Sequence, residues 1–123
     1  MRWAALILAG ASILFSACAK PPIAYYWGDY SSSLYNAKKN PTPESLQDHK
    51  KVLVHIIQES NRQSLRVPPG VYAEYGYLLL KEGNTTEGMK YLDLEAQTYP
   101  ESKVFVERVK VQATQPADGK ESE

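Results

Sequence analysis

Two histidines, a run of serines and a pair of acidic residues are the side chains with which this sequence could perform catalysis or bind a metal. His49 and His55 are six residues apart in a segment predicted to be helical, and six steps of 100° turn the second side chain by about 600°, onto another face. They are not expected to share a metal, because no third ligand is spaced to join them. Ser31–Ser33 lacks the strand–turn–helix setting of a nucleophile elbow, and Asp93 and Glu95 are interpreted as a solvated helix face. We therefore expect no enzyme, no cofactor and no metal site.

A single cysteine, Cys18, follows a short apolar segment at the start of the chain. Residues 3–14 are apolar but too few to span a bilayer, which is typical of a secretory signal peptide. Two small residues directly precede the cysteine, and this pattern resembles the bacterial lipobox, in which signal peptidase II cuts before a cysteine that becomes acylated. Phe15 stands where the lipobox usually has leucine. We expect residues 1–17 to be a lipoprotein signal peptide and Cys18 to be lipidated; the alternative is an ordinary signal peptide with a chance cysteine.

Removal of that segment leaves 106 of the 123 residues, enough for one domain with a modest core. Its 13 basic and 14 acidic side chains nearly balance, which argues against nucleic acid and against electrostatic binding to anionic lipid. Membrane attachment is therefore expected through acyl chains on Cys18, and stable anchoring needs more than one chain. In enterobacteria-like sorting, Asp after the cysteine retains a lipoprotein in the inner membrane. Ala19 thus favours the outer membrane, with the domain on its periplasmic face.

The segment from Val67 to Ser102 organises the rest of the chain. Pro68-Pro69-Gly70 interrupts any preceding helix. After it, one helical face is predicted from residues at relative positions 0, 3, 4 and 7, namely Tyr72, Tyr75, Gly76 and Leu79. Gly76 allows a close approach of a neighbouring helix. Gly83-Asn84 ends this helix.

A second helix of the same segment is predicted to start with Thr85 or Thr86 as its cap. Its packing face carries Gly88, Met89, Leu92, Ala96 and Tyr99. Two amphipathic helices joined by so short a loop must pack antiparallel. Since the first of them is apolar nearly all round, it is expected at the centre of the domain.

The N-terminal half predicts another pair of helices. The first runs from about Asp29 to Lys38, and Trp27, Tyr30, Ser31 and Leu34 repeat the 0, 3, 4, 7 spacing. A loop follows, in which Thr42 caps and Pro43 begins a helix that reaches about Ser60 or Gln63. Its predicted buried face consists of Leu46, Leu53, Ile56, Ile57 and Ser60.

A fifth helix is expected from Glu101 onward, covering the end of the stack. Its face carries Val104, Phe105, Val106 and Val109, a β-branched content that also fits a strand. From Thr114 the chain is polar and is expected to be disordered. The sequence thus predicts an all-α fold of about five helices in antiparallel hairpins, with a tether at 18–25, a helical domain at 26–113 and a tail at 114–123.

These spacings resemble the tetratricopeptide repeat. The block Tyr72-x2-Tyr75-Gly76-x2-Leu79, then Gly88-x3-Leu92, then Pro100 follows its pattern, with residues of roughly similar size at the departures. From Trp27-Gly28-Asp29-Tyr30 to Tyr99-Pro100-Glu101-Ser102, the chain looks like an uncharacterised family of small bacterial tetratricopeptide-like lipoproteins. Members are often encoded beside a lipoprotein similar to the curli secretion channel. The resemblance implies an envelope assembly with other lipoproteins as partners, and it brings no catalytic residues.

The candidate partner-binding residues are Glu74, Tyr77 and Lys81, which lie off the main packing stripe of their helix. In tetratricopeptide repeats this side lines the groove, where a tyrosine would be an anchor for a partner. The alternative is that the 29–38 helix covers Tyr77 and fills the groove. Two functions are therefore considered: a protein–protein adaptor at the outer membrane, or a periplasmic module that binds peptidoglycan or an exported peptide.

Overall fold

The computed structural model describes residues 25–115, and in this range the chain is all-α with five helices. They are α1 (Tyr30–Lys39), α2 (Pro43–Arg62), α3 (Val71–Lys81), α4 (Thr85–Thr98) and α5 (Lys103–Thr114), with one 3₁₀ turn, Pro100–Ser102, before α5. The predicted all-α, five-helix fold is confirmed. The signal peptide, Cys18 and the end of the predicted tail lie outside the described residues, so these expectations remain predictions.

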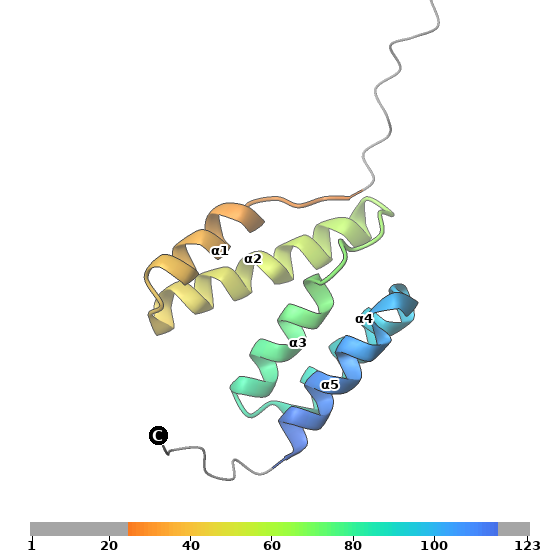
Figure 1. Ribbon diagram of the computed structural model, residues 1–123. Helices are drawn as coiled ribbons and strands as arrows, with labels where there is room; N and C mark the ends of the chain where they lie inside the picture. The colour runs from red at the N-terminus through yellow and green to blue at the C-terminus, as the bar shows by residue number, and fades with distance from the viewer. Residues whose placement is uncertain (1–24, 116–123) are drawn as a thin grey trace, which may run out of the picture.

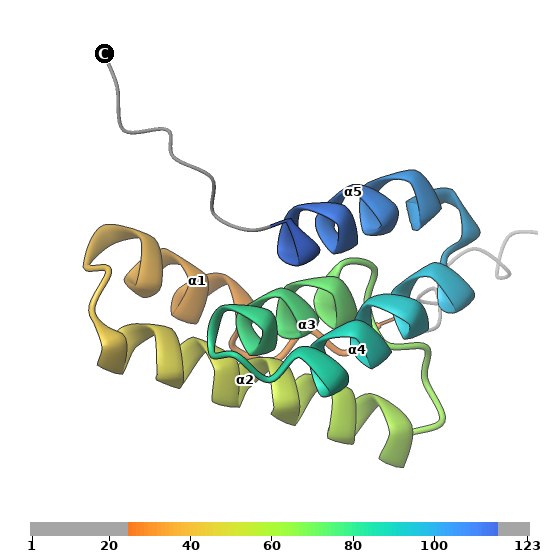
Figure 2. The same cartoon turned by 90° about the horizontal axis from the view of Figure 1, so that it is seen from below.

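The helices form two antiparallel pairs and a final helix. α1 and α2 lie side by side across the upper part of the molecule, and α3 descends from the end of α2 (Figure 1). α4 returns along α3, and α5 folds back over that pair (Figure 2). α3 contacts α2 on one side and α4 and α5 on the other, which is the central position that its apolar sequence predicted.

The ends of the helices follow from local side chains and glycine. The Thr42 hydroxyl accepts the Ser45 backbone N–H at 3.1 Å and the Ser45 hydroxyl accepts that of Thr42, a reciprocal capping box, while Pro43 takes the first helical position. Gly70 has φ +89° directly before α3, a conformation that glycine adopts without strain. The predicted threonine cap of α4 is wrong. Asn84 caps it instead, because its side-chain oxygen accepts the Glu87 N–H at 3.4 Å.

The core lies where α2 and α4 meet α3. One cluster joins α2 to the start of α3 and contains Leu53, Ile56, Ile57, Val67 and Val71. A second joins α3, α4 and α5 through Ala73, Leu92 and Val106. These clusters bury the stripes that the helical periodicity predicted for α2 and α4, apart from Leu46 of α2.

Leu46, Val104 and Phe105 are exposed, against the prediction that all three face the core. Leu46 is in the first turn of α2, where it lines a cleft left open between α2 and the end of α3. On α5 only Val106 is fully buried, with Val109 partly buried. Val104, Phe105 and Val106 are consecutive, and three consecutive residues at 100° each cannot all face one side of a helix.

Candidate functional site

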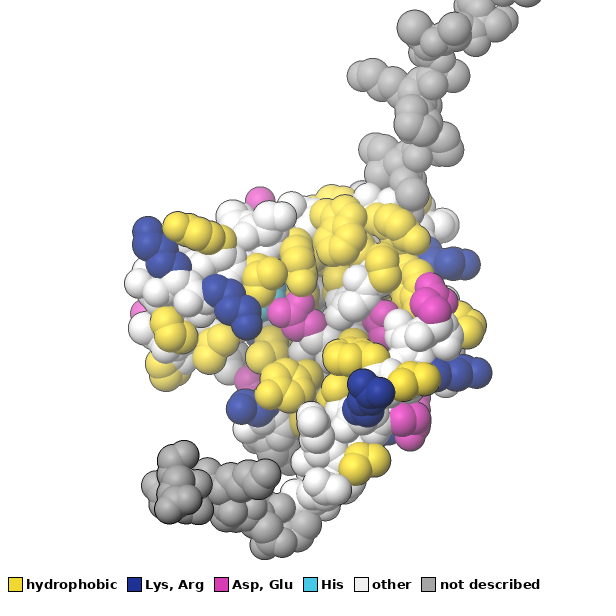
Figure 3. Space-filling view, viewed as in Figure 1, with side chains coloured by type: hydrophobic (Ala, Val, Ile, Leu, Met, Phe, Trp, Pro, Cys, Tyr) yellow, Lys and Arg dark blue, Asp and Glu magenta, His cyan; other side chains and the backbone are white. Residues whose placement is uncertain are grey.

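The three predicted site residues lie on one face of α3, at the junction of two clefts. Glu74, Tyr77 and Lys81 line a cleft of about 500 Å³ between α1, α2 and α3, here called the α1–α3 cleft. Glu74 and Tyr77 also line a cleft of about 420 Å³ between α3 and α5, called the α3–α5 cleft. Figure 3 shows this side of the molecule, on which apolar side chains surround a few acidic and basic groups. α3 therefore forms a wall between two concave, largely apolar surfaces.

Tyr77 is at the middle of this wall and is 46% exposed. The Lys81 ammonium lies 5.7 Å from the centre of its ring, within cation–π range. α1 does not cover the ring, so the alternative in which the groove is filled is wrong. Tyr77 presents a large, half-exposed aromatic surface, and the Lys81 ammonium lies beside it.

Glu74 is the centre of a polar network that links three helices. Its Oε2 accepts the hydroxyl of Tyr30 of α1 at 2.8 Å, and its Oε1 lies 3.1 Å from Nε2 of His49 of α2. Nδ1 of the same imidazole lies 2.7 Å from the Ser33 hydroxyl. With its proton on Nε2 the imidazole donates to Glu74, while the Ser33 hydroxyl, which donates to the Tyr30 carbonyl at 3.0 Å, also contacts Nδ1. The carboxylate is thus fixed from α1 and α2 while it projects from α3.

The network keeps Glu74 ionised and Tyr30 neutral. Partial burial alone would raise the pKa of the Glu74 carboxyl, but the hydrogen bonds from His49 and Tyr30 and the charge of Lys38 outweigh it, so that this pKa lies below its usual value. Burial, followed by the hydrogen bond to Glu74 and its charge, raises the pKa of Tyr30 to about 12. Glu74 therefore carries a negative charge at neutral pH.

Serine, histidine and glutamate in this order also form the charge-relay arrangement of a hydrolase. Here Ser33 lies within α1, its N–H donates to the Asp29 carbonyl at 3.0 Å, and its hydroxyl lies 3.0 Å from the Tyr30 carbonyl. Ser33 is not among the residues that line either cleft. An acyl substrate in a cleft would therefore not meet this hydroxyl, and the arrangement suits the positioning of Glu74 better than nucleophilic attack.

Glu95 contradicts its interpretation as part of a solvated face. It is 1% exposed, and its carboxyl group accepts the backbone N–H of Gly70 at 2.8 Å and of Ala73 at 3.4 Å. These donors are at the start of α3, whose first N–H groups have no partner within the helix. A side chain from α4 thus caps α3. Asp93 is exposed as predicted and pairs with Lys110 of α5.

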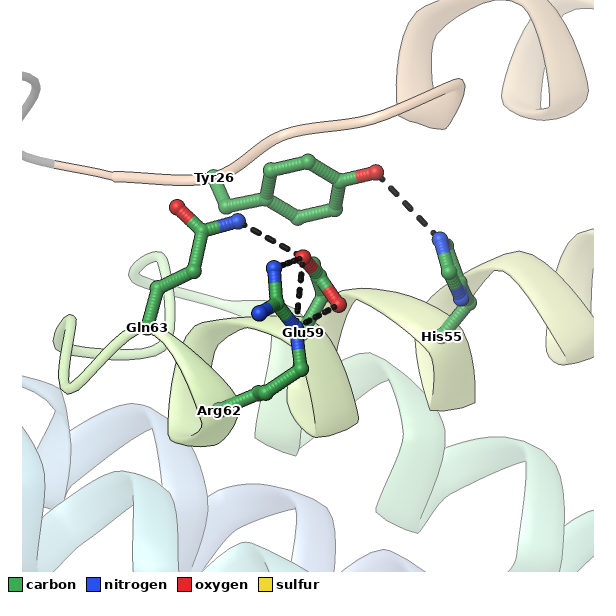
Figure 4. Close-up of polar contacts among 5 residues, drawn as sticks. All are labelled: Tyr26, His55, Glu59, Arg62 and Gln63. Atoms are coloured by element: carbon green, nitrogen blue, oxygen red, sulfur yellow. Dashed lines mark hydrogen bonds and ion pairs between the residues drawn. The ribbon is translucent and has the colours of Figure 1, made fainter.

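The two histidines are on different faces of α2, as their spacing predicted. His49 is buried beside Glu74, whereas His55 is exposed and its Nε2 lies 3.3 Å from the Tyr26 hydroxyl. Figure 4 shows Tyr26, from the segment before α1, above α2 with its hydroxyl directed at His55. In the same region, the Glu59 carboxylate accepts hydrogen bonds from Arg62 and Gln63. The Tyr26 side chain therefore packs against α2 of the same chain.

Residues 25–115 contain no group of three or more histidine, cysteine or acidic side chains arranged to hold a metal ion. Within the same range, no helix has the length and apolar character needed to cross a membrane.

Most of the polar network gave no signal in the sequence. The place of Glu74 on its helix predicts a functional role, but Tyr30, Ser33 and His49 are 44, 41 and 25 residues away from it. Only the fold brings them together. A histidine on the apolar side of a helix, as His49 is, was the one available indication of a buried polar contact.

Comparison with known protein families gives a match over most of the described residues. The family described as a domain of unknown function, DUF4810, matches residues 24–109, which is more than two thirds of the chain. The matched range contains the residues of α1 and α3 that line the two clefts, and it contains the polar network around Glu74. No curated protein and no solved structure matches the chain.

Proposed function

The chain belongs to the family of the domain of unknown function DUF4810, and on that premise we propose that it is a non-enzymatic adaptor. In this proposal it binds a partner protein through the face of α3 that carries Glu74, Tyr77 and Lys81. The partner is another protein of the bacterial envelope. No cofactor and no nucleic acid takes part.

One observation carries the proposal: Tyr77 is half exposed on a wall between two concave surfaces. A tyrosine held by its own helix loses little conformational freedom on binding and offers a large apolar area. Apolar side chains on both sides, such as Leu78 in one cleft and Val109 in the other, provide a surface from which a partner segment excludes water. Concave, apolar surfaces with few charged groups are typical of binding sites.

The proposed adaptor is a lipoprotein, anchored to the outer membrane on its periplasmic side through acyl chains on Cys18. The support is the apolar segment that ends in two small residues and the cysteine, together with Ala19 after it. Labelling of cells with a palmitate analogue tests the anchor. We expect label on the wild-type chain and none on Cys18→Ser, which should accumulate as precursor or be mislocalised. Unchanged labelling of the variant would contradict the lipid anchor.

A matched pair of tyrosine variants tests the binding face. Tyr77 and Tyr35 are both exposed, and each has a lysine four residues on, with its ammonium 5.7 Å or 5.6 Å from the ring centre. Tyr35 is on α1 and is not among the residues that line the two clefts. Crosslinking and pull-down from detergent-solubilised envelopes should capture a stoichiometric protein partner with the wild type and with Tyr35→Ala. Tyr77→Ala should lose about 2 kcal/mol or more of binding free energy.

Thermal melting of the same variants separates binding from folding. Tyr77→Ala should melt within a few degrees of Tyr35→Ala, since both side chains are exposed. If Tyr77→Ala loses stability but the folded fraction captures the partner normally, Tyr77 belongs to the core and the proposed face is wrong. Retention on peptidoglycan without a protein partner would replace the adaptor with a periplasmic ligand-binding module.

A further inference from the structure

The lining of the α3–α5 cleft is apolar or aromatic apart from Glu74 and Gln112. Its walls are apolar or aromatic, with Ala73 and Tyr77 on one side and Phe105 and Val109 on the other. Gln112 is its polar neutral side chain. Glu74 is the charged side chain among the described residues that line it. One acidic residue is thus part of the lining of an apolar cleft.

That carboxylate has binding capacity left. A carboxylate accepts about four hydrogen bonds, and Glu74 receives one at each oxygen, from Tyr30 and from His49. Its side chain is 27% exposed. Within residues 25–115, the structure gives it no lysine or arginine at ion-pair distance, and His49 is the one basic side chain that reaches it. Glu74 therefore offers free acceptor positions and a charge that no lysine or arginine neutralises.

We propose that Glu74 binds a lysine or arginine side chain of the partner, whose apolar stem lies in the α3–α5 cleft between Tyr77 and Phe105. Long basic side chains bury their methylene groups on apolar surface and keep the charged end at a polar site. The two aromatic rings that line the same cleft add a favourable contact for a cation. This inference rests on the proposed function and names the partner chemistry that the same face selects.

The charged residues that line the neighbouring α1–α3 cleft favour one orientation of a charged partner segment. Lys38, Lys50 and Lys81 all line the α1–α3 cleft, and only Lys50 of these three is paired, with Glu82. Glu74 and Glu82 line the same cleft, so lysines outnumber carboxylates there by one, whereas Glu74 is the charged residue that lines the α3–α5 cleft. A basic group is therefore favoured in the α3–α5 cleft over the α1–α3 cleft, and this difference favours one orientation of a charged segment across α3.

Glu74 is also held in place before any ligand arrives. Its two hydrogen bonds come from α1 and α2, so the carboxylate does not lose further freedom when a cation binds. Charge-assisted hydrogen bonds to a fixed carboxylate are stronger than those between neutral groups. Glu74 should therefore bind a side chain with a charged end much more tightly than one with an uncharged end, although the contact is small.

Small probes test this without the partner. The isotopically labelled full-length chain in detergent is titrated with N-acetyl-arginine amide, N-acetyl-lysine amide and the uncharged N-acetyl-norleucine amide, with N-acetyl-glutamate as the acidic probe. We expect the basic probes to shift the amide signals of Ala73, Tyr77 and Val109 in a saturable way, at millimolar concentration and more weakly in high salt. Norleucine and glutamate probes should bind at least about tenfold more weakly.

Variants then identify the carboxylate. Glu74→Gln should weaken the basic probes about tenfold, to the level of norleucine, whereas Glu101→Gln, at an exposed residue that lines neither cleft, should leave them unchanged. Phe105→Ala removes the opposite wall at an exposed position, 56% accessible, and should weaken them severalfold without lowering the melting temperature. This second variant keeps the test valid if Glu74→Gln is less stable.

The results separate this inference from the proposed function. Equal binding of arginine and norleucine probes, stronger binding of the glutamate probe, or full affinity in Glu74→Gln would overturn the cation site, even if Tyr77 proves essential for partner capture. Charge-selective binding of the probes, combined with no protein partner in the pull-down, would leave the cation site in place and contradict the adaptor.

Discussion

The two sides of α3 are joined to their neighbours in different ways. Toward α4 the backbones nearly touch: a methyl group added at Gly76 would lie 2.8 Å from the Gly88 carbonyl oxygen, and one at Gly88 would lie 2.9 Å from that of Gly76. Toward α1, no Cα atom of one helix lies within 8 Å of the other. There the connection is made by the side chains of Tyr30, His49 and Glu74.

This difference explains where a site can form. Close backbone packing leaves no room for a ligand, and it fixes the distance between α3 and α4. Polar side chains that bridge a wider gap hold the helices in register while the space beside them remains open as the α1–α3 cleft. The bridge also supplies the charged group of the proposed site. Rigid packing on one side of α3 thus supports a binding surface on the other.

The largest effect is expected at the close contact. Gly76→Leu should destabilise the domain by about 3 kcal/mol, because the new side chain meets the α4 backbone, which cannot move aside as a flexible side chain could. Leucine at the exposed position Tyr77 of the same helix serves as the control and should change stability little. Urea denaturation followed by circular dichroism measures both. Higher stability of Gly76→Leu, as helix propensity alone predicts, would show that the helices are not in close contact.

The second-largest loss of stability is expected when the buried carboxyl group of Glu95 is removed. Glu95→Ala leaves the N–H groups of Gly70 and Ala73 without their acceptor in a buried place, at a cost of about 2 kcal/mol. Glu95→Gln keeps one acceptor oxygen and should lose less. Asp93→Ala, two residues earlier and exposed, should be nearly neutral. Equal effects of the changes at 93 and 95 in the same denaturation experiment would contradict the cap that α4 provides for α3.

The polar bridge itself should have a smaller and more local effect. His49→Ala removes the contacts to Ser33 and Glu74 and should cost about 1–2 kcal/mol. Because α1 loses the contact of Ser33 with α2 and keeps the hydrogen bond of Tyr30 to Glu74, it is held less firmly. Its amide hydrogens should therefore exchange faster, while those of α4 should change only with global stability. His55→Ala, at the exposed histidine of the same helix, is the control. Equal acceleration in α1 and α4 would show that the bridge does not act locally.

The contacts on the α4 side could be predicted better from sequence than those on the α1 side. Helical periodicity identified the stripes of Leu53, Ile56 and Leu92, and a glycine within such a stripe predicted the close approach at Gly76. These signals are local, since each depends on spacing within one helix. The role of Glu95 and the bridge from His49 to Glu74 depend on residues that only the tertiary fold brings together, so the sequence pattern assigned Glu95 to solvent.

The smallest expected effect is the pH dependence of the bridge. The pKa of Glu74 is lowered in the folded chain, so the carboxylate contributes stability above its ordinary value of 4.5, and this contribution is lost as the pH falls through the lower folded value. Since the side chain is partly exposed and screened, we expect less than about 1 kcal/mol. Glu59 and Glu82 also have lowered pKa values, and they contribute to the acid dependence of the wild type. The difference between wild type and Glu74→Gln, in urea midpoints from pH 7 to 3, isolates the one group. That difference should be largest at pH 7 and shrink toward pH 3; a constant difference would show that the charge of Glu74 plays no part in joining α1 and α2 to α3.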